Sequence, residues 1–392
     1  MNKPVYIATY HQSKFGKLMN MSVPDIVKNA VTGACAEIKI TPELIDVGSI
    51  GAACNFSLNE QGLLAGLVAM VPGMQGKPIE AVENACATGG QAIISAIHKL
   101  QLGLGDVGIA VGFEKMRDNE GKMDGKLIGK VLGYFSHPEE REGKVFVFPH
   151  LFAEVMDAYI KQHKVTEQEL AQIAVAEYAN AKQNPFAQMK LDLTLEQATK
   201  IEGANRYIVD GLPLKTYDCS QITDGYAAII VATSEGLAKL GIPKQDCVEI
   251  LGYGQATDPL KKGGRDVLRP AGAYRAMTKA YEMADVTPKQ INVAEIHDCS
   301  RSWGQSGRKL LGKQNMGKAS LDGACAINTS GGLIAKGHPI GATGIAMVGW
   351  SAWQLLGKAP QPLQIANPRI AATFNIGGPI CASVCMVLKR AA

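Results

Sequence analysis

Cys86 stands where a thiol could act as a nucleophile. A short β-prone run, residues 79–82, leads toward it, and Thr88-Gly89-Gly90 then opens a segment whose apolar residues recur at helical spacing. The unpaired N–H groups and the positive dipole end of a helix favour an anion, so we expect the Cys86 thiol to lean toward thiolate. The pattern is typical of a reactive cysteine, although an arbitrary cysteine is more often a small buried hydrophobic residue.

A possible base for this thiol lies far downstream. His338 belongs to the stretch KGHPIGATG, residues 336–344, whose glycines and proline predict a rigid loop ahead of an apolar helix at 345–355. Backbone geometry would hold the imidazole of His338 in that loop, and imidazole exchanges protons readily near neutral pH. The competing interpretation is a loop histidine that is satisfied by its neighbours.

A second imidazole and a second thiol occur together. His297 and Cys299 lie in EIHDC, residues 295–299, at the end of a strand expected over 291–296. Further on, NIGG at residues 375–378 follows a strand expected over 370–374, and its glycine N–H groups, that of Gly377 among them, could face a ligand. Simple burial of Cys299 and an ordinary turn at Gly377 are the alternatives.

The elements that would position these groups occur in two copies. ITPELIDVGSI at residues 40–50 matches VTPKQINVAEI at 286–296, and in each the Thr is predicted to cap a helix whose first residue is Pro, with a β-rich run after it. Two further matches keep the order: residues 84–90 with 328–332, and the strand at 106–112 with that at 370–377. The chain is therefore predicted to contain one α/β unit twice.

A segment that has no counterpart in the repeat separates the two copies. Residues 114–144 are rich in charge and glycine, and residues 152–184 contain two amphipathic helical patterns. The second pattern begins with a Thr166-x-x-Glu169 capping box and stops at Asn184-Pro185. We interpret this region as an insertion over the first copy. Strands that alternate with helices and carry near-continuous apolar runs predict buried mixed sheets covered on both faces, so that one copy could supply the nucleophile and the other the base.

The composition is that of an ordinary globular protein. A chain of 392 residues predicts two or three domains, and a net charge of +4 without a dense Lys/Arg run argues against a nucleic-acid partner. Nine scattered cysteines, an odd number, predict reduced thiols and a cytoplasmic location. The N-terminus has no apolar signal core, and the longest apolar run, residues 63–71, is far shorter than a membrane span.

Taken in chain order, these patterns resemble the thiolase superfamily over roughly residues 4–389. The stretch GHPIGATG at 337–344 is the most specific part, and His-Asp-Cys at 297–299 is similar to the sterol-carrier-protein type of thiolase and acetyl-CoA acetyltransferase. The resemblance implies an α/β fold of two βαβαβαββ halves in a five-layered α-β-α-β-α arrangement. It places the first half at residues 1–115 and 214–250, an inserted loop domain covering the coenzyme A site at 116–213, and the second half at 251–392.

The resemblance also implies a mechanism. Cys86, activated by His338, would become acylated by a coenzyme A thioester. Cys299 would then deprotonate a second acyl-CoA while His297 and His338 hold the enolate oxygen. The N–H groups of Cys86 and Gly377 would form the oxyanion hole. The expected reaction makes or cleaves a 3-ketoacyl-CoA of the acetoacetyl-CoA class, without a metal or another cofactor.

Two positions depart from the thiolase pattern. Asn375 stands where the usual thiolase has a second catalytic cysteine, as expected if Cys299 has taken over proton transfer. Ser300 stands where the sterol-carrier type has Phe, which leaves the shape of the substrate pocket open.

The thiolase family is built as homodimers or homotetramers, and other functions stay open. One is an acyltransferase subunit in a complex with an HMG-CoA-synthase-like protein and a small OB-fold partner. A non-catalytic lipid-binding relative and a retro-aldolase of sterol side chains are also conceivable. Neither of these last two needs the nucleophile Cys86, so its presence argues against both.

Overall fold

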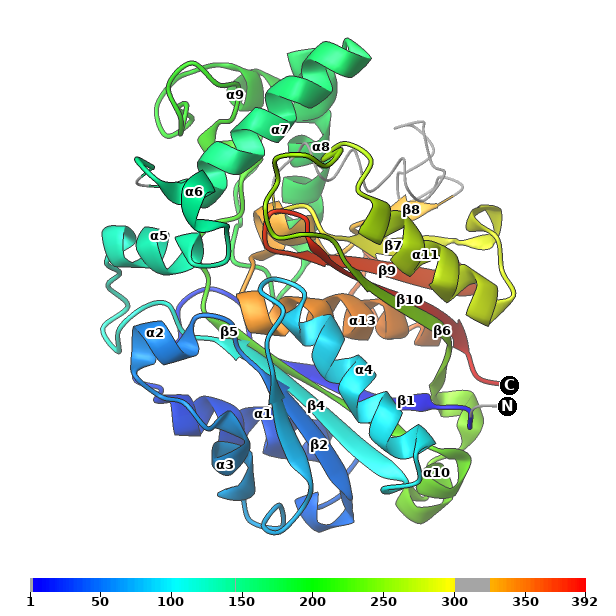
Figure 1. The fold of residues 1–392 in the computed structure, drawn as a ribbon. Helices are drawn as coiled ribbons and strands as arrows, with labels where there is room; N and C mark the ends of the chain where they lie inside the picture. Colours follow the sequence, from blue (N-terminus) through cyan, green and yellow to red (C-terminus); the bar gives the residue numbers. More distant parts are fainter. Residues whose placement is uncertain (1–2, 145, 300–324) are drawn as a thin grey trace.

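The computed structural model describes residues 3–144, 146–299 and 325–392, and its secondary structure falls into two similar halves (Figure 1). Ten described strands form one mixed sheet in the order β3-β2-β4-β5-β1-β6-β10-β9-β7-β8. Their bounds are β1 (Tyr6–Gln12), β2 (Val47–Gly51), β3 (Ile79–Val82), β4 (Val107–Glu114), β5 (Gly225–Ala232), β6 (Val248–Thr257), β7 (Val293–Ile296), β8 (Ala326–Ile327), β9 (Ile370–Gly377) and β10 (Ala382–Arg390).

The strand pairing confirms the predicted duplication. The first half reads β3-β2-β4-β5-β1, and the second, read inward from the other edge, reads β8-β7-β9-β10-β6. In each half the first three strands are parallel and the last two add antiparallel. The halves join where β1 pairs with β6 over Tyr6 and Ile7. Corresponding strands thus occur in the same chain order with the same directions.

The repeated Thr-Pro segments also fold alike. Each forms a 3₁₀ turn, η1 (Pro42–Leu44) or η4 (Pro288–Gln290), followed by strand β2 or β7. In the second turn the Gln290 side chain accepts hydrogen bonds from the N–H and the hydroxyl of Thr287, at 2.7 and 2.9 Å. The capping role predicted for Thr41 is wrong, because its side chain makes no cap hydrogen bond. The turn at Thr41 is closed instead by backbone hydrogen bonds from Leu44 and Ile45.

Helices cover both faces of each half and fill the space between the halves. α4 and α13 pack together in the centre, α1 and α3 lie outside the first half, and α11 lies outside the second (Figure 1). This is the predicted five-layered arrangement. The helix bounds are α1 (Val23–Glu37), α2 (Asn55–Asn59), α3 (Leu64–Ala69), α4 (Thr88–Gln101), α10 (Ser234–Leu240), α11 (Ala271–Ala284) and α13 (Ile340–Leu356), with the short turns η3 (Lys244–Asp246) and η6 (Gly332–Lys336, a π turn).

Side-chain alternation along the strands builds the layers. In β5, Ala227, Ile229 and Val231 join the central core with α4 and α13, whereas Ala228 and Ile230 join the outer core against α1. Both faces of the strand are buried, which explains the continuous apolar run in the sequence. The central core fixes α4 and α13 against each other, and the loops before these two helices contain Cys86 and His338.

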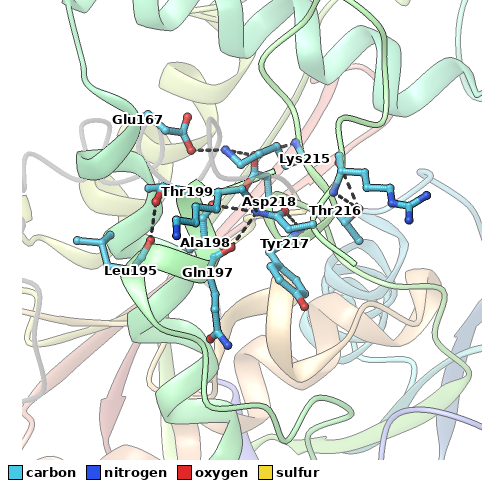
Figure 2. Close-up of polar contacts among 12 residues, drawn as sticks. Glu167, Leu195, Gln197, Ala198, Thr199, Lys215, Thr216, Tyr217 and Asp218 are labelled. Carbon is cyan, nitrogen blue, oxygen red and sulfur yellow. Dashed lines mark hydrogen bonds and ion pairs between the residues drawn. The ribbon is translucent and has the colours of Figure 1, made fainter. Parts of the chain in front are cut away.

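The segment between β4 and β5 is helical and lies over the strand ends of both halves (Figure 1). α8 begins at the predicted Thr166–Glu169 capping box and ends before Asn184, as expected. The end of the segment is attached to the start of α8, where the buried Lys215 forms an ion pair with Glu167 (Figure 2). The bounds are α5 (Gly125–Gly133), α6 (Pro138–Arg141), α7 (Val147–His163), α8 (Glu167–Gln183), α9 (Leu195–Thr199) and η2 (Thr216–Asp218).

Strand β9 spans the range 370–377 that the duplication predicted. The shorter range 370–374, expected ahead of NIGG, is wrong, because pairing with β10 continues through Asn375 to Gly377. Asn375 therefore lies inside a strand, not in a loop after it. Ser300 lies outside the described residues, and the domain boundaries given above stay a prediction. Among the helices of the described ranges, none is long and apolar enough to cross a membrane.

Candidate active site

Cys86 lies in a tight turn between β3 and α4. Ala85 adopts a left-handed conformation with φ +47°, which a non-glycine residue keeps only when its surroundings hold it there. The Thr88 hydroxyl donates to the Ala85 carbonyl at 2.6 Å and accepts from the Asn84 N–H at 2.9 Å. These bonds close the turn and hold the thiol at the N-terminal end of α4, which is the predicted position.

The thiol is not poised as a thiolate. Burial raises the pKa of Cys86 to about 12, the nearby Glu114 carboxylate adds to this, and the N–H of Gly378 bonded to the sulfur offsets only part of it. The expectation of a lowered pKa for Cys86 is therefore wrong, because desolvation of the sulfur and the Glu114 carboxylate outweigh the backbone hydrogen bonds to it. Attack by Cys86 then requires a base to take its proton.

His338 presents an unprotonated nitrogen toward the site. The Thr343 hydroxyl donates to the Pro339 carbonyl at 2.9 Å, and its oxygen lies 2.7 Å from Nδ1 of His338. A hydroxyl has one hydrogen to give, so this oxygen accepts from Nδ1–H and leaves the lone pair on Nε2. Burial and the Lys336 ammonium lower the pKa of His338 to about 3, so the ring is neutral and Nε2 is available as a base.

His297 has the opposite tautomer. The amide nitrogen of Asn375 donates to the Cys86 carbonyl at 2.9 Å and lies 3.0 Å from Nδ1 of His297. Because the carbonyl can only accept, that atom of Asn375 is the NH₂ group, and Nδ1 of His297 must accept from it. His297 therefore has its hydrogen on Nε2, and burial lowers its pKa so that the ring is neutral.

These three side chains converge. The Cys86 sulfur and one nitrogen of each imidazole lie within 4.8 Å of one another, and the two rings stand edge to face with centroids 5.1 Å apart. Nε2 of either histidine has no hydrogen-bond partner among the described residues. The site thus brings together a thiol, an imidazole that can accept at Nε2 and an imidazole that can donate at Nε2. A thiol and two imidazoles at this spacing could also ligate a metal such as zinc; the expectation of metal-free chemistry stays a prediction.

The other predicted residues lie close by. Cys299 lines the same cavity as Cys86 and His338. Gly377 packs against the Cys86 turn so tightly that a Cβ there would lie 2.1 Å from the Asn84 carbonyl oxygen, so only glycine fits. The N–H groups that act on the Cys86 sulfur are those of the next residue, Gly378, and of Cys86 itself; Gly378 was not among the predicted site residues.

Glu114 is a second residue near the site that the sequence patterns did not single out. It ends strand β4, is fully buried, and accepts hydrogen bonds from the N–H groups of Ala53, Cys54 and Gly341 at 2.9–3.0 Å. It thereby ties the β2–α2 connection to the first turn of α13, next to His338. Burial raises the pKa of Glu114 to about 7. The available signal was a carboxylate ending the apolar run VGIAVGFE.

A duplicated α/β fold with a cysteine and a histidine before two facing helices, and a second histidine after a strand, defines a thiolase-type acyltransferase. Comparisons with known proteins support this class. A model of the thiolase N-terminal domain matches residues 5–235, and a model of the thiolase C-terminal domain-like family matches residues 254–390. The chain belongs to the thiolase family, as its resemblance predicted.

Individual relatives match over nearly the whole chain. An acetyl-CoA acetyltransferase of Methanothermobacter thermautotrophicus is 31% identical over 96% of this chain and 97% of its own. Bovine sterol carrier protein 2 is 28% identical over 95% of this chain and 70% of its own. A chain of the solved structure titled "Ltp2-ChsH2(DUF35) aldolase" has the same fold, with a TM-score of 0.79 at 19% identity over 99% of this chain and 98% of that one.

Proposed function

We propose that this protein makes or cleaves a 3-ketoacyl-CoA through an acyl-Cys86 intermediate, with coenzyme A thioesters as substrates. The observation that carries the proposal is the meeting of the Cys86 thiol with two neutral imidazoles of opposite tautomer within 4.8 Å. Acyl transfer needs a base for the thiol, and enolate formation needs a hydrogen-bond donor for the developing oxyanion. His338 fits the first requirement and His297 the second.

In the acylation step, the Cys86 sulfur attacks the thioester carbonyl carbon while its proton moves to Nε2 of His338. The carbonyl oxygen becomes an oxyanion, for which the N–H groups of Cys86 and Gly377 are the proposed donors, each worth about 3–4 kcal/mol. The bond from carbon to the coenzyme A sulfur then breaks, and His338 returns the proton to that sulfur. Cys86 is left as a thioester and His338 is neutral again.

In the condensation step, Cys299 acts as its thiolate: it takes an α-proton from a second acyl-CoA and becomes the thiol. The enolate oxygen accepts a hydrogen bond from Nε2–H of His297; His338 donates there only while Nε2 holds a proton. The enolate carbon attacks the acyl carbon on Cys86, and the bond from that carbon to the Cys86 sulfur breaks. The Cys299 thiol passes its proton to the leaving Cys86 sulfur, which restores the Cys86 thiol and the Cys299 thiolate. The products are a 3-ketoacyl-CoA and the free enzyme, and the reverse sequence is cleavage by coenzyme A.

Mass spectrometry tests the intermediate. Incubation with acetyl-CoA is expected to add one acetyl group at Cys86, and Cys86→Ala is expected to lose both the label and all turnover. Stable acylation of another cysteine, with Cys86 unmodified, would overturn the assignment.

A second candidate function is that of an acyltransferase subunit in a complex with an HMG-CoA-synthase-like protein and an OB-fold partner. This candidate is supported by the fold match to a structure whose title names two components, Ltp2 and ChsH2(DUF35). Gel filtration after co-expression with such partners separates the two candidates: a stable complex supports the subunit role, and full activity of the isolated chain argues against any need for a partner.

We also propose a homodimer or homotetramer in the cytoplasm. Strand β3 is an edge of the sheet, and α3, which packs on it, is flanked by Leu63 and Met70 with 82% and 70% exposure. Exposed apolar residues beside an open strand edge are typical of an association surface. Sedimentation of Leu63→Asp is expected to show dissociation; an unchanged oligomer would exclude this surface.

A further inference from the structure

A cavity of about 150 Å³ opens beside the Cys86 thiol. The inserted segment forms much of its wall, and α7 contributes two rings from one helix face, those of Phe148 and Phe152, with centroids 5.8 Å apart. The apolar lining side chains come from α5 and α7, from the residues that follow β4 and α5, from the segment before β5 and from the start of α13: Met116, Leu132, Phe135, Phe148, Pro149, Phe152, Ile222 and Ile340.

The lining of this cavity is uncharged among the described residues. Apart from the reacting groups, its polar side chains are those of Ser220 and Gln221, both neutral, and no Asp, Glu, Lys or Arg of the described ranges contributes. A carboxylate entering the cavity would lose its water without gaining a cation, which is strongly unfavourable. An apolar group would gain contacts on several sides.

The volume of this cavity limits the size of the group that it can hold. An apolar cavity of about 150 Å³ lined by aliphatic and aromatic side chains is large enough for a benzene ring. An acetyl group has one methyl beyond its carbonyl and would leave most of this space unfilled, with the loss of the dispersion contacts that a larger group makes. Water would find few hydrogen-bond partners there.

We propose that this cavity holds the acyl group carried by Cys86, and that this group is uncharged, apolar and compact, of the size of a benzoyl group or a five-carbon branched chain. The inference rests on the acyl-Cys86 chemistry proposed above and adds the class of substrate. Phe148 and Phe152 act as specificity residues, and Leu132 limits the space between α5 and the thiol.

Another occupant of the cavity would be the pantetheine arm of coenzyme A, which every acyl-CoA shares. The two occupants give different results when the cavity is narrowed. If the arm fills it, narrowing slows all acyl-CoAs by the same factor. If the acyl group fills it, narrowing changes the ratio between large and small acyl groups.

The experiment measures single-turnover acylation of Cys86 with acetyl-, isovaleryl-, benzoyl- and succinyl-CoA by rapid quench and mass spectrometry. Isovaleryl- and benzoyl-CoA are expected to acylate Cys86 with a second-order rate constant at least about tenfold above that of acetyl-CoA, since each apolar carbon buried adds to binding in the transition state. Succinyl-CoA is expected to react at least about a hundredfold more slowly than benzoyl-CoA, because its carboxylate would lie unpaired in the cavity.

A matched pair of variants then tests the place of binding. Leu132→Phe narrows the cavity and is expected to lower the benzoyl-to-acetyl ratio at least about tenfold. Leu127→Phe makes the same change in the same helix at a residue that is 43% exposed and does not line this cavity, and it is expected to leave the ratio unchanged.

The outcomes separate this inference from the function on which it rests. If no acyl-CoA labels Cys86, the proposed function fails and the inference with it. If acetyl-CoA labels Cys86 as fast as benzoyl-CoA, or succinyl-CoA reacts as well as either, the proposed function stands and the substrate class is wrong. A uniform loss for all acyl-CoAs in Leu132→Phe assigns the cavity to the pantetheine arm and also overturns the inference. If Leu132→Phe does not fold, the acylation rates of the unmodified protein with the four acyl-CoAs still test the substrate class.

Discussion

The side-chain nitrogen of Asn375 lies 3.0 Å from Nδ1 of His297, and the same nitrogen donates to the backbone carbonyl of Cys86. One amide thus fixes the tautomer of an imidazole and joins that ring to the turn of the proposed nucleophile. The position where the usual thiolase has a second catalytic cysteine is here occupied by a positioning residue. The hydrogen bond from Asn375 to Nδ1 favours the tautomer of His297 that donates at Nε2.

Asn375→Asp is expected to damage condensation selectively. A carboxylate accepts from Nδ1–H, so His297 would present a lone pair at Nε2 and lose its hydrogen bond to the enolate. We expect α-proton exchange of acetyl-CoA, followed by NMR, to fall by about 10²–10³-fold, the usual loss for one oxyanion donor. Acylation of Cys86, followed by mass spectrometry, is expected to fall much less. Equal losses in both steps would mean that Asn375 only supports the fold.

Cys299→Ala is expected to separate the two half-reactions in another way. Cys299 lines the cavity that Cys86 and His338 share, and no cysteine is available at position 375 to take the α-proton. The variant is expected to acquire the acyl group on Cys86 yet to fail in condensation and in α-proton exchange. Exchange at the unmodified rate would show that Cys299 merely fills space.

Thr343→Val is expected to slow acylation of Cys86. Valine has nearly the shape of threonine but cannot accept from Nδ1–H of His338, so the tautomer with a free Nε2 loses its support. We expect a fall of roughly 10–100-fold in the rate of Cys86 acylation, with a similar fall in iodoacetamide alkylation. Thr343→Ser keeps the hydroxyl and is the control; a loss as large in Thr343→Ser would point to packing instead.

Glu114→Gln is expected to change the pH dependence of the Cys86 thiol. An ionised Glu114 disfavours the thiolate, so its removal should lower the pKa of Cys86 and speed alkylation by about three- to tenfold at pH 8–9. The pKa of Glu114 itself is raised to about 7, so the two proteins should react alike below pH 6, where Glu114 is neutral. Glu120→Gln, a change at a 71% exposed side chain, is the control. Identical profiles for Glu114→Gln and the unmodified protein would exclude this electrostatic effect.

Several features of this protein were determined by the sequence by itself. The paired Thr-Pro segments, the Thr166–Glu169 cap and the apolar periodicity of α4 are encoded within a few consecutive residues, and short-range hydrogen bonds and side-chain spacing decide them. Such signals predicted the duplication and the elements that carry Cys86 and His338. The family resemblance then ranked these residues above the many other cysteines and histidines.

Only the tertiary structure decided the protonation states and hydrogen-bond partners of the site side chains. Cys86 and Asn375 stand 289 residues apart in the chain, and their hydrogen bond exists because β9 and the α4 turn meet in the core. The raised pKa of Cys86 follows from burial and from Glu114, neither of which a local helix-terminus argument contains. The strength of a charge or a hydrogen bond depends on which distant atoms replace water around it. For this reason the sequence located the reacting residues, whereas their protonation states and partners became visible only in the packed fold.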